Sequence, residues 1–433
     1  MKIAKFLPAI LLLIFAASAG SAQETANAPS PHENIKQHTN AIFDDLVKVR
    51  RDFHVHPEVS GQEERTARKI LEYLDSLGLE VKTNIGGYGV VGVLKGGKEG
   101  KTVAWRADID AMASDVPDVV DFPSVNEGIR HICGHDVHTT IGLGIANVLS
   151  QQKDSLAGNV YFIFQPSEEN YKGAKAMIDD GLLEMAEFDE IYGLHISPFP
   201  VGTVATKAES VYAHTNKAKV TYKLTGNEDA KIDFTKAAIS GFQNVPADSE
   251  FWNWENLGDP EIGIENPNTI FTDFFTVKEK FGIEETNDEV VITAVLNSSN
   301  KAQLNSFLKD LKQKIQVSEY SKDLVSVDYS YEKAVVVNDE ELTNQSIKSI
   351  TGIYGEESVI PLYGVVTADR GDDFAYFQQE VPGVYYFLGG ANYETGVISM
   401  PHSPDFAVDE ESIRFGVSYF SSVLLDRINR VQK

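Results

Sequence analysis

The chain has 433 residues, and its 64 acidic residues outnumber its 38 lysines and arginines, which gives a formal charge of -26. Binding to nucleic acid or to anionic lipid depends on clustered positive charge, so both kinds of partner are disfavoured. With 42% hydrophobic residues, the chain can bury a sizeable core and is long enough for about two or three domains.

The first 22 residues have the pattern of a secretory signal peptide. Two lysines precede an apolar run from Phe6 to Ala17, and small residues follow up to Ala22. A run of about a dozen apolar residues is too short to span a bilayer, which takes about 20. We therefore expect cleavage after Ala22, export to the periplasm or the extracellular space, and no membrane attachment of the mature chain.

The chain contains a single cysteine, Cys133, which cannot form an intramolecular disulfide. A free thiol in an oxidising compartment is vulnerable unless it is buried or bound to a metal. The residues around Cys133 therefore indicate whether its thiol is buried or bound to a metal.

Helical and apolar segments alternate in the first half of the mature chain. Apolar residues recur at helical spacing over residues 35–53 and again over residues 67–77, before Gly78. Further helices are predicted at 139–149 and 172–183. Short apolar runs that read as strands lie at 89–94, 102–105, 160–164 and 191–196. This alternation predicts an α/β fold with a mixed, mostly parallel sheet flanked by helices.

The pattern changes near Glu209 and changes back near Tyr331. Between these residues, strands are predicted at 217–225, 271–285 and 289–296, and helices at 234–242 and 301–315. This order is typical of a small α+β unit. A strand at 384–388 and a last helix at 410–428 follow. We therefore predict a catalytic domain in two pieces, 32–208 and 331–433, interrupted by a lid or dimerisation-like domain at 209–330.

Three of the ten histidines, His131, His135 and His138, lie close to Cys133 in one short segment. A thiolate and an imidazole two residues apart are ligands that zinc and similar divalent ions take up. Gly134 lies between Cys133 and His135 and lets the chain turn, so that both side chains can point at one centre. A histidine-rich loop around a buried structural cysteine remains the alternative from this segment alone.

Acidic residues follow two of the predicted strands. Glu168 and Glu169 come after the strand at 160–164, and Asp108 and Asp110 come after the strand at 102–105. The carboxyl ends of strands in an open α/β sheet are where ligands bind. Most acidic pairs in this chain are expected to be solvated, and only their position sets these four apart.

Two more histidines occupy suggestive positions, at the end of an apolar run and in a proline-braced loop. They are His195 and His402, and each taken alone is more often structural than functional. The remaining histidines are interpreted as structural or exposed, and they are His32, His38, His54, His56 and His214.

Taken in order, these segments resemble the zinc-dependent amidohydrolases of the aminoacylase, hippurate hydrolase and indole-acetyl-amino-acid hydrolase group, relatives of the dinuclear zinc carboxypeptidases. The resemblance covers most of 45–208 and 331–428. Its most specific string is His-x-Cys-Gly-His-Asp-x-His at 131–138. The other strings lie at 56–58, 106–111, 164–169, 193–195, 371–377 and 402–406.

The resemblance implies a centre of two divalent metals, with zinc expected first and manganese, cobalt or nickel as alternatives. The implied metal ligands are Cys133, His135, Glu169, His195 and His402, and Glu168 is the implied general base. Residues that could support the ligands from behind are Asp108, Asp110, Asp136 and His138. The implied reaction is hydrolysis of the amide bond of an N-acyl amino acid or a small peptide by metal-activated water.

The predicted lid departs from the family pattern. Family members usually carry a Gly-Gly-His-Ala stretch whose histidine steadies the oxyanion, whereas residues 224–231 contain no histidine, and His214 is expected to face solvent on a strand. The usual asparagine segment that helps hold the substrate carboxylate is also not recognisable near 281–288. The sequence therefore leaves open which group is the oxyanion donor, whether the chain forms a homodimer and whether it prefers a substrate with a free carboxylate. A metal-binding pseudoenzyme and a ligand-binding protein remain alternative functions.

Overall fold

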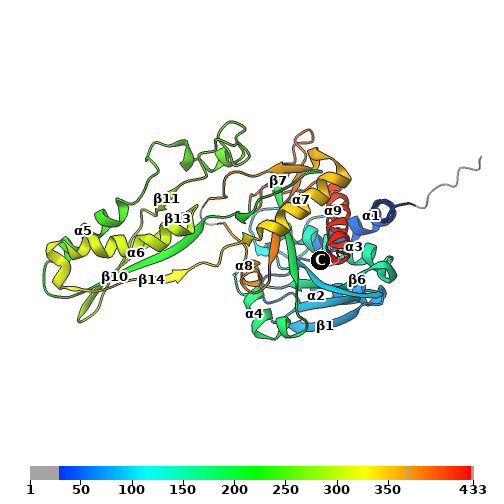
Figure 1. Ribbon diagram of the computed structural model, residues 1–433, viewed down its shortest axis with the longest axis horizontal. Helices are drawn as coiled ribbons and strands as arrows, with labels where there is room; N and C mark the ends of the chain where they lie inside the picture. The colour runs from blue at the N-terminus through cyan, green and yellow to red at the C-terminus, as the bar shows by residue number, and fades with distance from the viewer. Residues whose placement is uncertain (1–28, 368–369, 431–433) are drawn as a thin grey trace, which may run out of the picture.

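The computed structural model describes residues 29–430 except 368 and 369, so the predicted signal peptide lies outside the described residues. Two larger β-sheets organise the described chain, one of eight strands and one of five. The five-stranded sheet and its helices extend away from the eight-stranded sheet as an elongated arm (Figure 1). Within the described ranges, no helix is both long enough and apolar enough to cross a membrane.

The eight-stranded sheet has a parallel centre and antiparallel neighbours, which confirms the predicted fold class. The adjacent pairs β6–β3, β3–β7 and β7–β17 are parallel, whereas β1–β2, β2–β6 and β17–β8 are antiparallel. In sheet order, the strands are β1 (Glu80–Ile85), β2 (Gly89–Lys95), β6 (Ala157–Gln165), β3 (Lys98–Asp108), β7 (Glu190–Pro200), β17 (Gly383–Ala391), β8 (Val204–Thr206) and β16 (Val359–Pro361).

Helices cover both faces of this sheet because its central strands are buried on both sides. One hydrophobic cluster joins the sheet to α1 (Pro31–Val55), α2 (Glu64–Ser76), α3 (His135–Ser150), α7 (Glu340–Tyr354) and α9 (Glu411–Ile428). A second cluster on the other face includes α4 (Gly173–Asp179) and α8 (Ala375–Gln378). Helix α4 is shorter than the helix predicted at 172–183. It ends at Asp179 because Gly181 takes a left-handed conformation before a short 3-10 turn.

The five-stranded sheet is antiparallel, and its polar and apolar residues alternate as the sequence indicated. Its strands are β10 (His214–Lys223), β11 (Phe275–Val277), β12 (Gly282–Glu285), β13 (Glu289–Ser298) and β14 (Leu324–Glu332). Helices α5 (Glu228–Ser240) and α6 (Lys301–Gln316) pack on it through a third hydrophobic cluster. Two short two-stranded sheets complete the pairing, β4 (Met112–Ala113) with β5 (Ile129–Arg130) and β9 (Glu209–Ser210) with β15 (Val337–Asn338).

Two expectations for the inserted segment are wrong. The strand predicted at 271–285 is two short strands, β11 and β12, which pair with different parts of β13. His214 does not face solvent, since it is 9% exposed and its Nε2 lies 2.9 Å from the Ser210 hydroxyl. It begins β10 where the arm joins the larger sheet, and burial lowers the pKa of His214 to about 4. The division into two domains stays a prediction.

Candidate metal centre

The carboxyl ends of three parallel strands and the start of one helix meet at the same edge of the large sheet. Strand β3 ends at Asp108, β6 ends at Gln165, and β7 carries His195. Helix α3 begins at His135, directly after Gly134. The φ of Gly134 is 91°, and a Cβ on this residue would come 2.4 Å from Ile196 Cγ2 on β7. Only glycine therefore allows the Cys133 loop to approach β7 this closely.

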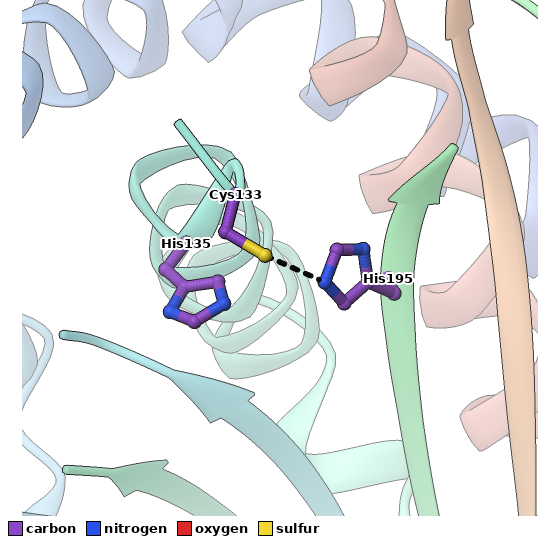
Figure 2. A group of neighbouring side chains, drawn as sticks. All are labelled: Cys133, His135 and His195. Atoms are coloured by element: carbon purple, nitrogen blue, oxygen red, sulfur yellow. Dashed lines mark hydrogen bonds between the residues drawn. The ribbon is translucent and has the colours of Figure 1, made fainter. Parts of the chain in front are cut away.

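The five predicted metal ligands converge at this edge. Cys133 Sγ lies 3.2 Å from His195 Nε2 and 3.1 Å from His402 Nε2. Glu169 Oε1 lies 3.5 Å from His402 Nε2 and 3.7 Å from His135 Nε2. Figure 2 shows Cys133 between His135 and His195, with its sulfur directed toward the His195 ring. Side chains from distant parts of the sequence thus enclose a single small volume.

The donor set fits divalent cations. The buried atoms His135 Nε2 and Glu169 Oε1 have no hydrogen-bond partner among the described residues, although buried polar atoms are normally paired. Five overlapping groups at this edge offer ligand atoms within 4.8 Å of one another, and two of them share Cys133. These two are Cys133 with His135 and His195, and Cys133 with Glu169 and His402. Sulfur, imidazole and carboxylate are the ligands that zinc and related metals bind.

The predicted supporting residues orient these ligands. His135 Nδ1 lies 2.8 Å from the Asp110 carbonyl oxygen, and an imidazole that binds a metal through one nitrogen usually donates from the other to such an oxygen. His138 Nε2 accepts from the Ile196 backbone N–H at 2.8 Å, and its Nδ1 lies 2.6 Å from Asp108 Oδ1. Both nitrogens of His138 are therefore occupied, which leaves it in a supporting position.

Asp136 anchors the start of α3 through a buried network that includes His54. Its Oδ2 forms an ion pair with Arg50 Nε at 2.8 Å and lies 2.9 Å from His54 Nδ1. Burial alone would lower the pKa of His54, but hydrogen bonds to Asp118 and Asp136 raise it overall. His54 is thus a structural residue, as the sequence indicated.

Glu168 lies beside the ligand cluster in a buried group of acids. Its Oε2 is 3.9 Å from His135 Nε2, and its carboxylate oxygens lie within 4.8 Å of those of Asp372 and Asp373. Burial raises the pKa of Glu168 well above its usual range, and the charges of Asp372, Asp373 and Glu169 raise it further. Glu168 is therefore placed to accept a proton and hold it.

Burial also raises the pKa of the Cys133 thiol well above its usual range, and the Glu169 charge adds to this effect. The thiol of the chain alone thus keeps its proton at neutral pH. A bound divalent cation reverses this preference, because a coordinated thiol is deprotonated.

Three residues near the site were not predicted as functional, and they are Arg106, Asp372 and Asp373. The fully buried guanidinium of Arg106 lies 2.7 Å from Asp108 Oδ2, 3.0 Å from Asp372 Oδ1 and 3.2 Å from Asp373 Oδ1. The charged residues in the strings at 106–111 and 371–377 could have indicated these three residues. The sequence near each string, however, does not indicate that the two strings contact each other.

Two named proteins are similar to this chain over most of its length. YhaA of Bacillus subtilis, which is named as an amidohydrolase, is 32% identical over 389 residues, which cover 88% of this chain and 94% of YhaA. N-acetyldiaminopimelate deacetylase of Enterococcus faecalis is 30% identical over 390 residues, which cover 88% of this chain and 97% of the deacetylase.

One solved structure shows the same fold. It is the YXEP protein of Bacillus subtilis, described as a dinuclear metal binding peptidase from the M20 family, with a TM-score of 0.69 and 24% identity. The alignment covers 90% of this chain and all of that protein.

The family assignment follows from the sequence match itself. The sequence model of peptidase family M20/M25/M40 matches residues 104–426, which is most of the chain. The predicted resemblance to amidohydrolases is therefore confirmed, and the chain belongs to peptidase family M20/M25/M40, a hydrolase that acts on amide bonds.

Proposed function

We propose that this chain is an exported, metal-dependent amidohydrolase that cleaves the amide bond of N-acyl amino acids or small peptides. The observation that carries the proposal is the convergence of five metal-ligand side chains beside the buried carboxyl of Glu168. The two relatives named as an amidohydrolase and as N-acetyldiaminopimelate deacetylase support this class of substrate.

Cys133, His135 and His195 would hold one divalent cation, and Cys133, Glu169 and His402 would hold a second. When bound, two such cations polarise an amide carbonyl and make a water molecule more acidic. Zinc is expected first because the set contains sulfur and imidazole, with manganese, cobalt or nickel as alternatives.

Glu168 would act as the general base. It takes a proton from water as the water oxygen bonds to the amide carbonyl carbon, and it passes that proton to the nitrogen as the C–N bond breaks. The products are a carboxylic acid and a free amine. The carboxyl of Glu168 carries the proton between these two steps.

The decisive experiment compares the parent protein with Glu168→Gln on N-acetyl amino acids, N-benzoyl amino acids and dipeptides. We expect both proteins to bind the same amount of metal and the variant to hydrolyse at least about 100-fold more slowly, the usual effect of losing a positioned base. Equal rates, or a parent protein that binds no divalent metal, would refute the proposal.

Export is supported by the pattern of residues 1–22 alone. When the full chain is expressed in a bacterium with a periplasm, we expect the recovered protein to begin at Gln23, as determined by mass spectrometry. A chain that is recovered from the cytoplasm with Met1 or Lys2 intact would contradict export while leaving the catalytic proposal standing.

A further inference from the structure

The Tyr171 side chain is a buried donor that the proposed mechanism does not use. Its hydroxyl has no hydrogen-bond partner among the residues that the structure describes. Its backbone N–H donates to the Glu168 carbonyl oxygen at 2.7 Å, so Tyr171 and the general base belong to the same turn after β6. A tyrosine hydroxyl ordinarily keeps its proton at neutral pH, so it is available as a hydrogen-bond donor.

The Lys333 ammonium lies next to this ring. Its Nζ is 4.2 Å from the centre of the Tyr171 ring and donates to the Arg370 carbonyl at 3.2 Å. Lys333 directly follows β14, where the chain returns from the arm to the larger sheet (Figure 1). The Lys333 ammonium therefore comes from the segment after β14, whereas Tyr171 comes from the segment after β6.

Both groups lie close to Gly371. This glycine has a φ of 150°, and a Cβ built on it would come 2.2 Å from Tyr171 Oη and 3.1 Å from Lys333 Nζ. Gly371 directly precedes Asp372, whose carboxylate lies within 4.8 Å of Glu168. A neutral hydroxyl donor and a positive charge thus converge beside a cluster that is otherwise acidic.

We propose that the Tyr171 hydroxyl and the Lys333 ammonium form an oxyanion-binding pair in the wall of the active site, in the role that a lid histidine would otherwise have. A hydroxyl and an ammonium that converge on one point stabilise a negatively charged oxygen, most strongly where water is excluded. The inference rests on the proposed function, since the oxygen belongs to the substrate.

Two oxygens of the substrate carry the negative charge that such a pair would bind. One is the carbonyl oxygen, which becomes negative when water adds to the amide. The other is the carboxylate of an N-acyl amino acid. The two sources differ in kinetics, because an interaction made only in the transition state changes kcat, whereas one made equally in the ground state changes KM.

The test compares Tyr171→Phe and Lys333→Met with the parent, using N-benzoylglycine and its decarboxylated analogue N-methylbenzamide. If the pair binds the developing oxyanion, kcat falls at least about tenfold on both compounds with KM little changed. If it binds the carboxylate, KM rises at least about tenfold for N-benzoylglycine alone. Changes below twofold in both variants on both compounds would overturn the inference.

Matched controls are Tyr376→Phe and Lys301→Met. Both residues line the cavity of about 380 Å³ to which Lys333 also contributes, and neither has a place in the proposed pair. We expect parent kinetics from both. Circular dichroism and metal content of every variant should match the parent, which separates a local loss from misfolding.

A failure of the proposed function is distinguishable from a failure of this inference. If the parent hydrolyses neither compound, hydrolysis of this substrate class is refuted, and the pair is then judged by the binding of N-benzoylglycine in calorimetry. Weakening of at least about tenfold in Tyr171→Phe and Lys333→Met would support the pair as an anion site, and unchanged binding would overturn it.

Discussion

One buried cation among several buried acids dominates the electrostatics behind the metal centre. Arg106 contacts Asp108, Asp372 and Asp373, and all four side chains are fully buried. One guanidinium cannot neutralise three carboxylates, so burial and the Asp372 charge raise the pKa of Asp373 to about 8 despite Arg106. The residual negative charge is compensated when divalent cations bind in front of it.

Removing the Arg106 charge should therefore destabilise the fold. For Arg106→Met we expect the free energy of unfolding to fall by about 3 to 5 kcal/mol, because buried carboxylates lose their partner. Urea denaturation measures the change, and Arg68→Met on the exposed face of α2 is the control. A loss below about 1 kcal/mol would contradict a buried ionic role.

The pH dependence of metal binding follows from the protons that the ligands must lose. Burial raises the pKa of the Cys133 thiol, and the Asp108 charge and the hydrogen bond to Asp110 raise the pKa of His135 despite burial. Both groups hold protons in the chain alone and release them to a metal, so affinity should rise with pH and fall as pH is lowered. Calorimetry in buffers of different ionisation enthalpy measures the release.

Cys133→Ala provides the check on this assignment. At metal concentrations high enough to saturate its weakened sites, the variant should release about one proton fewer per chain than the parent, since the thiol is gone. The same proton release in both proteins would show that Cys133 does not bind as a thiolate. His56→Ala, in a half-exposed side chain away from the ligands, should behave as the parent does.

Residue chemistry could be read from the sequence only where it is local. The string at 131–138 carries Cys133 and His135 within one turn, so it favours a metal site over a histidine-rich loop around a structural cysteine. Tyr171, Lys333 and Arg106 acquire their neighbours only when the chain folds, because Lys333 meets Tyr171 across 162 positions of sequence. No periodicity or short motif encodes such a contact.

At the scale of elements, prediction succeeded where strands are long and buried. The runs at 89–94, 102–105, 160–164, 191–196 and 384–388 all fall within strands of the large sheet. Strands β8 and β16 have three residues each, and β1 is mostly exposed, so they lack an apolar run to detect. These strands lie toward the edges of the sheet, and their pairing with neighbouring strands defines them.

The element that positions the site most sensitively is the turn into α3. Gly134→Ala would add a Cβ 2.4 Å from Ile196 Cγ2 in a left-handed residue, so either the loop or β7 must move. We expect the variant to lose most of its bound metal and about 1 to 3 kcal/mol of stability. Metal analysis and urea denaturation measure the two effects.

Gly128→Ala is the matched control for this turn. Gly128 has a φ of 75°, and a Cβ there would meet nothing within 4 Å, so the variant bears only the backbone strain. It should keep its metal. If Gly134→Ala and Gly128→Ala retained equal amounts of metal, the close approach of the Cys133 loop to β7 would not be what positions the ligands.

At the scale of the whole molecule, bound metals would connect segments that are far apart in the sequence. Its ligands come from the start of α3, the loop after β6, the strand β7 and the loop at His402, and these segments do not otherwise share one element. A ligand that binds only the folded state stabilises it in proportion to the logarithm of its concentration over Kd. Occupancy of the site should therefore be visible in the thermal stability of the chain.

Removing the metals should lower Tm. At a metal concentration about 1,000 times Kd, each site contributes about 4 kcal/mol, so chelation should lower Tm on the order of 10 °C. Differential scanning calorimetry with and without a chelator measures the shift. Glu168→Gln should keep the full shift because Glu168 is not a ligand, whereas Cys133→Ala, which removes a side chain shared by both candidate sites, should lose most of it. An unchanged Tm after complete metal removal would mean that the ligand segments are held together by packing alone.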